Sequence, residues 1–132
     1  MLSLGKVGIR CKDMDKSASF YRDILGLKEF IVGGLPADRL RFFSAGGGFL
    51  ELIKADPEDK PQEVDGHAGI NHFAFIVSGI NELASDLKKK GVKILSEPRE
   101  IVSGTWYAFI EDPNGMRIEL LEFAKGEPWL DR

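Results

Sequence analysis

Hydrophobic and polar positions repeat in two similar halves of the chain. Residues 6–26 and 72–91 both begin with a short apolar strand, continue through a polar segment into an amphipathic helix, and end at a glycine. In the first strand Val7, Ile9 and Cys11 alternate with polar or small residues, which is the period of two expected of a strand with one face on a core. The repeat predicts two modules of the same topology.

The predicted helices have clear starts and ends. Asp13 can accept hydrogen bonds from the first amides of a helix that begins at Met14, and Gly26 ends that helix. The second helix closes with three lysines before Gly91, where cations complement the negative end of the helix dipole. The apolar positions at helical spacing are Ala18, Tyr21, Ile24 and Leu25 in the first helix and Ile80, Leu83, Ala84 and Leu87 in the second.

Three further strands follow each helix, so both halves are predicted to be βαβββ and the fold class to be α+β. We expect one domain over residues 1–132, with module 1 at about 4–56, a linker at about 57–66, module 2 at about 67–124 and a tail at 125–132. The further strands are predicted at 28–32, 39–44 and 49–54, and at 92–96, 105–111 and 116–123.

Two carboxylates and an imidazole lie within apolar strands. Glu51 and Glu119 have apolar neighbours on both sides, so each needs a metal, a cation, a hydrogen-bond network or a proton to compensate its burial. His72 opens the first strand of the second half, and Lys6 holds the equivalent position in the first half. If a pseudo-twofold axis relates the halves, we expect these four side chains to converge.

Each of these residues also has a structural interpretation. A lone glutamate in a strand usually faces solvent, and a lone histidine is often a hydrogen-bonded rim residue. Arg10 shares a strand face with Lys6, so it either anchors an anionic group of a substrate or is a solvated cation. Trp106 and Tyr107 either line a pocket or belong to the core, and Trp129 is expected to dock the tail or an oligomer contact.

Composition and charge limit the kinds of partner that we expect the protein to bind. The chain has 132 residues and a formal net charge of −3, which argues against a nucleic-acid partner. The single Cys11 excludes an internal disulfide. No window approaches the ~20 apolar residues that span a bilayer, so we expect no membrane partner and a cytoplasmic location.

Three segments resemble a known family. They are FYRDILGL after the first strand, INHFAFIV at the start of the second half and FIEDPNGMRIELLE near the end. Their order and the duplicated layout resemble the glyoxalase, bleomycin-resistance and extradiol-dioxygenase group, the vicinal oxygen chelate superfamily. Within it the chain looks most similar to the lactoylglutathione lyase and methylmalonyl-CoA epimerase branches.

The resemblance implies two βαβββ modules that form a curved mixed sheet around a cleft, commonly in a homodimer. It also implies a divalent metal, held here by Glu51, His72 and Glu119, with the identity open among Zn, Ni, Mn, Co and Fe. Family enzymes usually carry His or Gln where this chain has Lys6. A protonated lysine offers hydrogen-bond donors and no lone pair, so it cannot ligate a cation.

This departure leaves three hypotheses. In the first, the metal polarises adjacent oxygens of a small molecule in a lyase or isomerase, and Glu51 or Glu119 moves a proton as the catalytic carboxylate. In the second, Lys6 replaces the metal, and the protein binds or sequesters a small ligand without chemistry. The third is an extradiol dioxygenase, for which His67 would have to supply a second imidazole from a loop. Lys6, Arg10 and Trp106 are the expected substrate-binding residues.

Overall fold

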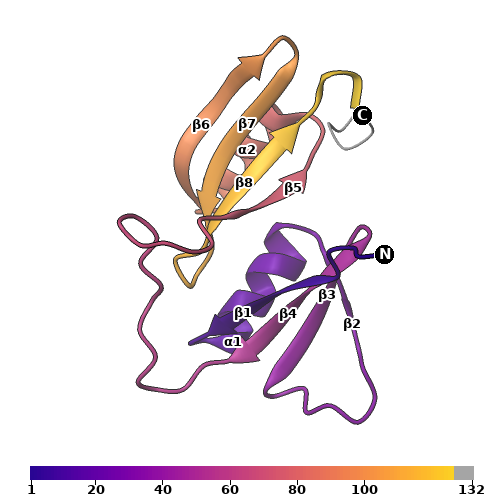
Figure 1. The fold of residues 1–132 in the computed structure, drawn as a ribbon, viewed down its shortest axis with the longest axis vertical. Helices are drawn as coiled ribbons and strands as arrows, with labels where there is room; N and C mark the ends of the chain where they lie inside the picture. The colour runs from indigo at the N-terminus through magenta and orange to yellow at the C-terminus, as the bar shows by residue number, and fades with distance from the viewer. Residues whose placement is uncertain (127–132) are drawn as a thin grey trace. The chain divides into compact units, whose positions relative to one another are not determined.

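The computed structural model describes residues 1–126, and the chain divides into two compact units at Pro61 and Gln62 (Figure 1). We call the unit up to Pro61 module 1 and the unit from Gln62 module 2. The division falls within the segment expected to be the linker. Trp129 and most of the expected tail lie outside the described residues.

Module 1 is a four-stranded mixed sheet with one helical segment. Its strands are β1 (Lys6–Cys11), β2 (Lys28–Phe30), β3 (Leu40–Ala45) and β4 (Gly48–Lys54), in the spatial order β1-β4-β3-β2. β1 runs parallel to β4, and the other pairs are antiparallel. Between β1 and β2 lie the α-helix α1 (Met14–Ser19) and a π-helical turn, Phe20–Ile24.

Module 2 repeats this arrangement. Its strands are β5 (Phe73–Ile76), β6 (Lys93–Val102), β7 (Thr105–Glu111) and β8 (Arg117–Glu122), in the order β5-β8-β7-β6. β5 is parallel to β8, and α2 (Ile80–Lys89) connects β5 to β6. A short 3-10 turn, Ala124–Gly126, follows β8. The predicted α+β class with two βαβββ modules is confirmed.

The two helices begin with different caps. In α1 the Asp13 carboxylate accepts a hydrogen bond from the Lys16 amide at 3.0 Å, as the sequence predicts. In α2 the residue before the helix is Gly79, which has no side chain to offer. The Glu122 carboxylate from β8 takes its place and accepts from the Gly79 and Ile80 amides at 2.5 and 3.3 Å.

Most predicted strand ends lie within two residues of the observed ones, and two elements differ more. The segment from Met14 to Leu25 was expected to be one α-helix, but its second part widens into a π-turn in which the Leu25 amide donates to the Phe20 carbonyl at 2.9 Å. The turn places Tyr21 fully inside the core, and Gly26, at a φ of 80°, ends the segment. β6 runs on to Val102 through register shifts against β7, beyond the predicted end at residue 96.

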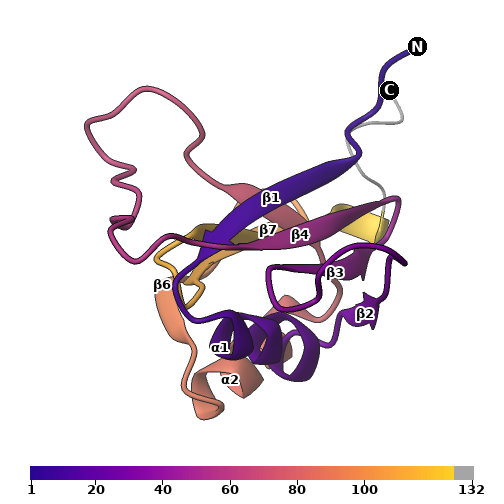
Figure 2. The ribbon, with the colours of Figure 1, turned by 90° about the horizontal axis from the view of Figure 1, so that it is seen from below.

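Each sheet packs one face against its own helix. Figure 2 shows α1 on one side of the β1, β4 and β3 strands, and α2 packs against β6, β7 and β8. We call the opposite side of each sheet its helix-free face. The side chains buried between sheet and helix include Ile9, Cys11, Tyr21, Phe43, Leu50 and Leu52 in module 1 and Ile80, Leu87, Ala108, Ile110, Ile118 and Leu120 in module 2. Within residues 1–126 no helix has the length and apolar character needed to cross a membrane.

Candidate functional site

The strand register places the predicted polar groups at equivalent points of the two helix-free faces. Glu51 pairs with Gly8 across the parallel β1–β4 ladder, and Glu119 pairs with Ala74 across the β5–β8 ladder. Lys6 and His72 each lie two residues before those small partners. Residues two apart point to the same side of a strand, so each carboxylate shares its face with the polar group that precedes it. The predicted equivalence of Lys6 and His72 holds in the backbone register.

In module 1 the Glu51 carboxylate is compensated by an ammonium group. Lys6 Nζ donates to Glu51 Oε2 at 2.7 Å. The Glu51 side chain is 14% exposed and the Lys6 side chain 50%, so the carboxylate is the more enclosed partner. Lys6 Nζ also lies 5.9 Å from the centre of the Phe49 ring, within the range of a cation–π contact. We call these two ionic side chains the first half-site.

In module 2 the equivalent pair is more open. His72 Nε2 lies 3.5 Å from Glu119 Oε1, with side-chain exposures of 33% and 17%. This separation is longer than a good hydrogen bond. His72 Nδ1 lies 2.7 Å from the Asn71 amide oxygen, and the tautomer of the imidazole decides which ring nitrogen donates. An amide oxygen can only accept, so Nδ1 carries the proton in the tautomer that forms this hydrogen bond. In a neutral imidazole Nε2 then presents its lone pair toward Glu119. We call these two side chains the second half-site.

Each half-site has an aromatic wall that the sequence analysis did not single out. Phe42 of β3 is the cross-strand partner of Glu51, and Phe109 of β7 is the cross-strand partner of Glu119. The Phe109 ring lies edge-on to the His72 ring at 5.0 Å between centres. Pairing the hairpin strands residue by residue from their turns would have found both phenylalanines, because each hairpin is antiparallel and tightly closed.

The structure places Trp106 on the side of β7 away from Glu119. Its cross-strand partner is Glu122, the cap of α2, and it alternates with the buried Ala108 and Ile110. Tyr107, the next residue along, shares the helix-free face with Phe109, with 5.8 Å between their ring centres. The strand thus turns Trp106 toward the helix and Tyr107 toward the second half-site.

Arg10 points to the helix-free side of β1 but is engaged by the segment after β4. Its guanidinium donates to Asp59 Oδ2 at 2.9 and 2.5 Å and to Asp56 at 3.3 Å. Hydrogen bonding and charge from Asp59 raise the pKa of Arg10 above its usual value, and Arg10 in turn lowers the pKa of Asp59. Its predicted contact with a substrate anion stays a prediction.

His67 lies in the loop before β5, where its Nε2 is 2.8 Å from Glu63. Its side chain is 59% exposed and that of Glu63 80%, so both are in contact with solvent. His67 and Glu63 have the i, i+4 spacing of a local surface contact, and such an exposed ion pair contributes little to the stability of the fold. The role of His67 as a second imidazole ligand of an iron ion stays a prediction.

The second half-site suits a shared cation, whereas the first does so only if Lys6 withdraws. Metal-bound nitrogen and oxygen atoms lie about 2.0–2.2 Å from the ion, so two such ligands at ordinary angles are about 3.0–3.7 Å apart. The 3.5 Å between His72 Nε2 and Glu119 Oε1 falls in that range. The Glu51 oxygen nearest Lys6 already accepts from an ammonium group at 2.7 Å. Within either module of residues 1–126, no three His, Cys, Asp or Glu side chains gather as a metal cluster.

These observations define a class: an α+β protein made of two βαβββ modules, each carrying a carboxylate paired with a phenylalanine on its helix-free face. The family model for the Glyoxalase/Bleomycin resistance protein/Dioxygenase superfamily matches residues 3–120. The chain belongs to this superfamily, whose members bind small molecules and commonly use divalent metals.

Relatives at about one-third identity carry lyase and epimerase names. The chain is 34% identical over 121 residues to a probable lactoylglutathione lyase of Synechocystis sp., covering 86% of this chain and 90% of that protein. It is 31% identical over 126 residues to the human mitochondrial methylmalonyl-CoA epimerase, covering 89% of this chain and 72% of the epimerase. A probable chloroplastic lactoylglutathione lyase of Arabidopsis thaliana is 34% identical over 120 residues, which are 86% of this chain and 33% of that longer protein.

Solved structures agree on the fold. A lactoylglutathione lyase from Agrobacterium tumefaciens superimposes with a TM-score of 0.67 at 25% identity, covering 91% of this chain and 92% of the other. A glyoxalase/dioxygenase from Nostoc punctiforme reaches a TM-score of 0.74 at 21% identity, with 92% and 90% covered. The second likeness concerns the fold alone.

Proposed function

We propose that this protein is a lyase or isomerase of the glyoxalase type that acts on a small molecule with adjacent oxygens and uses a divalent metal ion. The observation that carries the proposal is the second half-site, where His72 Nε2 and Glu119 Oε1 face each other at 3.5 Å. The Asn71 contact fixes the imidazole orientation, as hydrogen-bond partners of metal-bound histidines do. The names of the lactoylglutathione lyase and epimerase relatives add support.

The proposed ligands are His72, Glu119 and Glu51. A bound divalent ion would supply a Lewis acid that stabilises negative charge on a substrate oxygen. For Glu51 to join, Lys6 has to leave its carboxylate, and the 50% exposure of the Lys6 side chain gives it room to do so. The withdrawn ammonium can then donate a hydrogen bond to an oxygen or anionic group of the substrate.

The chain's own groups would carry the proton transfer. Glu51 and Glu119 are the candidate bases, since each is mostly enclosed, and whichever of the two does not hold the ion can accept a proton from a carbon next to a carbonyl group. Phe42 and Phe109 lie opposite them on the neighbouring strands. Arg10 remains a proposed contact for a substrate anion once Asp59 releases it. A homodimer is part of the proposal, as expected for this type of protein.

The second candidate function is metal-free binding of a small ligand. The Lys6–Glu51 contact favours it, because a 2.7 Å ion pair compensates the carboxylate without any metal. In that case the aromatic walls and the ionic side chains hold an organic ligand, and no carboxylate acts as a base.

Metal content separates the two functions. The protein, purified without chelator or affinity tag, is analysed for metal and then titrated with Zn, Ni, Mn, Co and Fe. We expect one ion per chain in the wild type and its loss in Glu119→Gln and His72→Gln, while Glu97→Gln, a surface carboxylate paired with Lys88 on the same module, retains it. A wild type that neither contains nor takes up any of these ions contradicts the enzyme proposal and favours the binding function.

Activity is then sought with the metal-loaded protein. A panel of thiol adducts of 2-oxoaldehydes, acyl-CoA thioesters and catechols is incubated in deuterated buffer, and the products are followed by NMR. Deuterium incorporation next to a carbonyl group, absent in Glu119→Gln, is the expected result. Ring cleavage of a catechol would instead assign the protein to the dioxygenases.

A further inference from the structure

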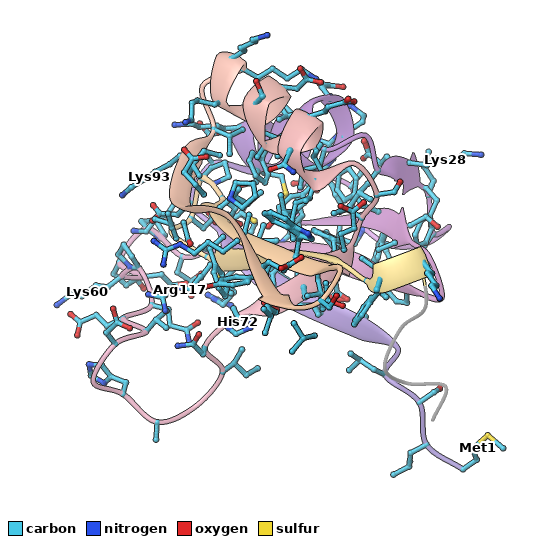
Figure 3. All side chains as sticks on the ribbon, turned by 90° about the horizontal axis from the view of Figure 1, so that it is seen from above. Met1, Lys28, Lys60, His72, Lys93 and Arg117 are labelled. Atoms are coloured by element: carbon cyan, nitrogen blue, oxygen red, sulfur yellow. The ribbon has the colours of Figure 1, made fainter. Side chains whose placement is uncertain are left out.

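Arg117 places a positive charge beside the second half-site. It is the first residue of β8 and lies two residues before Glu119, so the two side chains share the helix-free face. Its register partner on β7 is Glu111, and the pairing of Phe73 with Ile118 puts His72, the residue just before β5, beside it. Figure 3 shows the His72 and Arg117 side chains next to the loop that precedes β5. The equivalent position in module 1 is Phe49, so of the two modules only module 2 has a cation at this position of the sheet.

The partner of Arg117 is held loosely. Arg117 Nη2 lies 3.3 Å from each carboxylate oxygen of Asp65, a residue of the loop before β5. The Asp65 side chain is 84% exposed, whereas that of Arg117 is 28% exposed. Two long contacts from one nitrogen to a solvated carboxylate form a weak ion pair that another anion can replace.

The other carboxylates on this face are already engaged. Glu111 lies 3.5 Å from Lys93 Nζ, and Glu119 faces His72. Arg117 therefore takes its counter-ion from an exposed loop rather than from a strand. A guanidinium presents several N–H donors in one plane, which matches the geometry of a carboxylate or a phosphate.

We propose that Arg117 recognises an anionic group, a carboxylate or a phosphate, of the small molecule that the second half-site binds, and that Asp65 occupies this position in the free protein. The choice of the second half-site as the substrate site rests on the proposed function. Arg117 and Glu119 are separated by two residues of strand, about 6.6 Å, so a molecule of a few atoms can reach both. The substrate class is then a small organic acid or phosphate ester with its reactive oxygens that far from the anionic group. Asp65 acts as an internal competitor that a substrate anion displaces.

The test uses simple anions and the full chain without added metal, so it does not depend on catalysis. Inorganic phosphate and, separately, acetate are titrated into the protein while the Arg117 side-chain N–H signal is followed by NMR, assigned through Arg117→Lys. We expect a saturable shift with at least one anion. A stronger response to phosphate assigns a phosphorylated substrate, and a stronger response to acetate a carboxylate.

Variants make the inference refutable. Arg117→Gln should weaken binding of the responding anion about tenfold or more, as expected for loss of hydrogen bonds from a charged donor. Asp65→Asn should strengthen it about two- to fivefold, the range expected for removal of an exposed ion pair. Lys88→Gln removes the same charge from the outer surface of α2 and should leave the affinity unchanged. No saturable shift in either the wild type or Asp65→Asn overturns the proposal.

Failure of this inference can be told from failure of the proposed function. If Arg117 ignores both anions while His72 and Glu119 still bind one metal ion, only the anion role is lost. If the anion binds at Arg117 but no metal binds, the anion site stands and the lyase or isomerase assignment falls.

Discussion

Replacing Lys6 by glutamine tests whether its ammonium group competes with a metal ion for Glu51. Lys6 Nζ lies 2.7 Å from Glu51 Oε2, and a metal ion bound to the same carboxylate would lie about 2.1 Å from its oxygen. If the ammonium stayed in place, it would lie roughly 4–5 Å from the ion, and their repulsion would drive its withdrawal. A unit charge and a doubly charged ion at that distance repel by about 2 kcal/mol in a water-like dielectric, the suitable limit because half of the Lys6 side chain is exposed.

Two kilocalories correspond to about thirtyfold in affinity. We therefore expect Lys6→Gln to bind Zn²⁺ or Ni²⁺ about thirtyfold more tightly than the wild type. Lys6→His should exceed this gain, because an imidazole adds a lone pair where the ammonium had none. Competition with a metal-sensitive dye gives the affinities directly.

The control is Lys54→Gln, which removes an exposed lysine from β4 without removing the partner of Glu51. It should bind metal as the wild type does. Equal metal affinities in Lys6→Gln, Lys6→His and Lys54→Gln would refute the reasoning, since the charge nearest the carboxylate would then have no influence on the ion. A gain shared by all three would mean that net charge matters and position does not.

Two further predictions concern stability. Arg41 donates to both oxygens of Glu29 at 2.8 Å and lowers the pKa of this carboxyl group below its unfolded value. The pair therefore stabilises the fold at pH values above the unfolded pKa of Glu29 and loses this contribution as the pH falls toward the folded pKa. Glu29→Gln should lower the free energy of unfolding by about 1–3 kcal/mol at neutral pH, as measured by urea titration. The difference between the variant and the wild type should shrink in acid. Glu122→Gln should weaken the cap of α2 and cost about 0.5–2 kcal/mol in the same assay without changing metal affinity; an altered affinity would contradict a purely structural role.

The fold could be predicted well because its signals are local and repeated. Most strands could be located from their alternating apolar residues. The helix ends could be located from the Asp13 cap and the terminal glycines, and the duplication predicted the order of the elements. The π-turn after Ser19 could not be predicted, because Ala18, Tyr21 and Leu25 keep the apolar spacing of an α-helix. The cap of α2 could not be predicted either, since its carboxylate comes from Glu122, more than forty positions away along the chain.

Only part of the candidate site could be predicted from the sequence. The positions of Glu51, Glu119, Lys6 and His72 followed from the repeat, because a polar residue in an apolar strand stands out. The face of Trp106 did not follow, since a period of two leaves open which of two neighbouring aromatic residues points to the helix. The pairing of Arg10 with Asp56 and Asp59 depends on how the segment after β4 folds back, and no short-range pattern encodes that.

The two half-sites show how a duplicated backbone can carry different chemistry. Both keep a carboxylate on the fourth strand of their module and a phenylalanine opposite it on the third, so the enclosed acid and its wall are common to both. The substitutions fall at the surrounding positions, where Lys6 corresponds to His72 and Phe49 to Arg117. In module 1 the cation contacts the carboxylate directly and its neighbour is a ring. In module 2 the imidazole lies 3.5 Å from the carboxylate, and the cation lies two residues before Glu119 on β8, where it contacts the loop that precedes β5. With such a division, Glu51 would stay paired with Lys6 in the first half-site until Lys6 withdraws. The second half-site would present the imidazole of His72 to the proposed metal ion and the guanidinium of Arg117 to an anion.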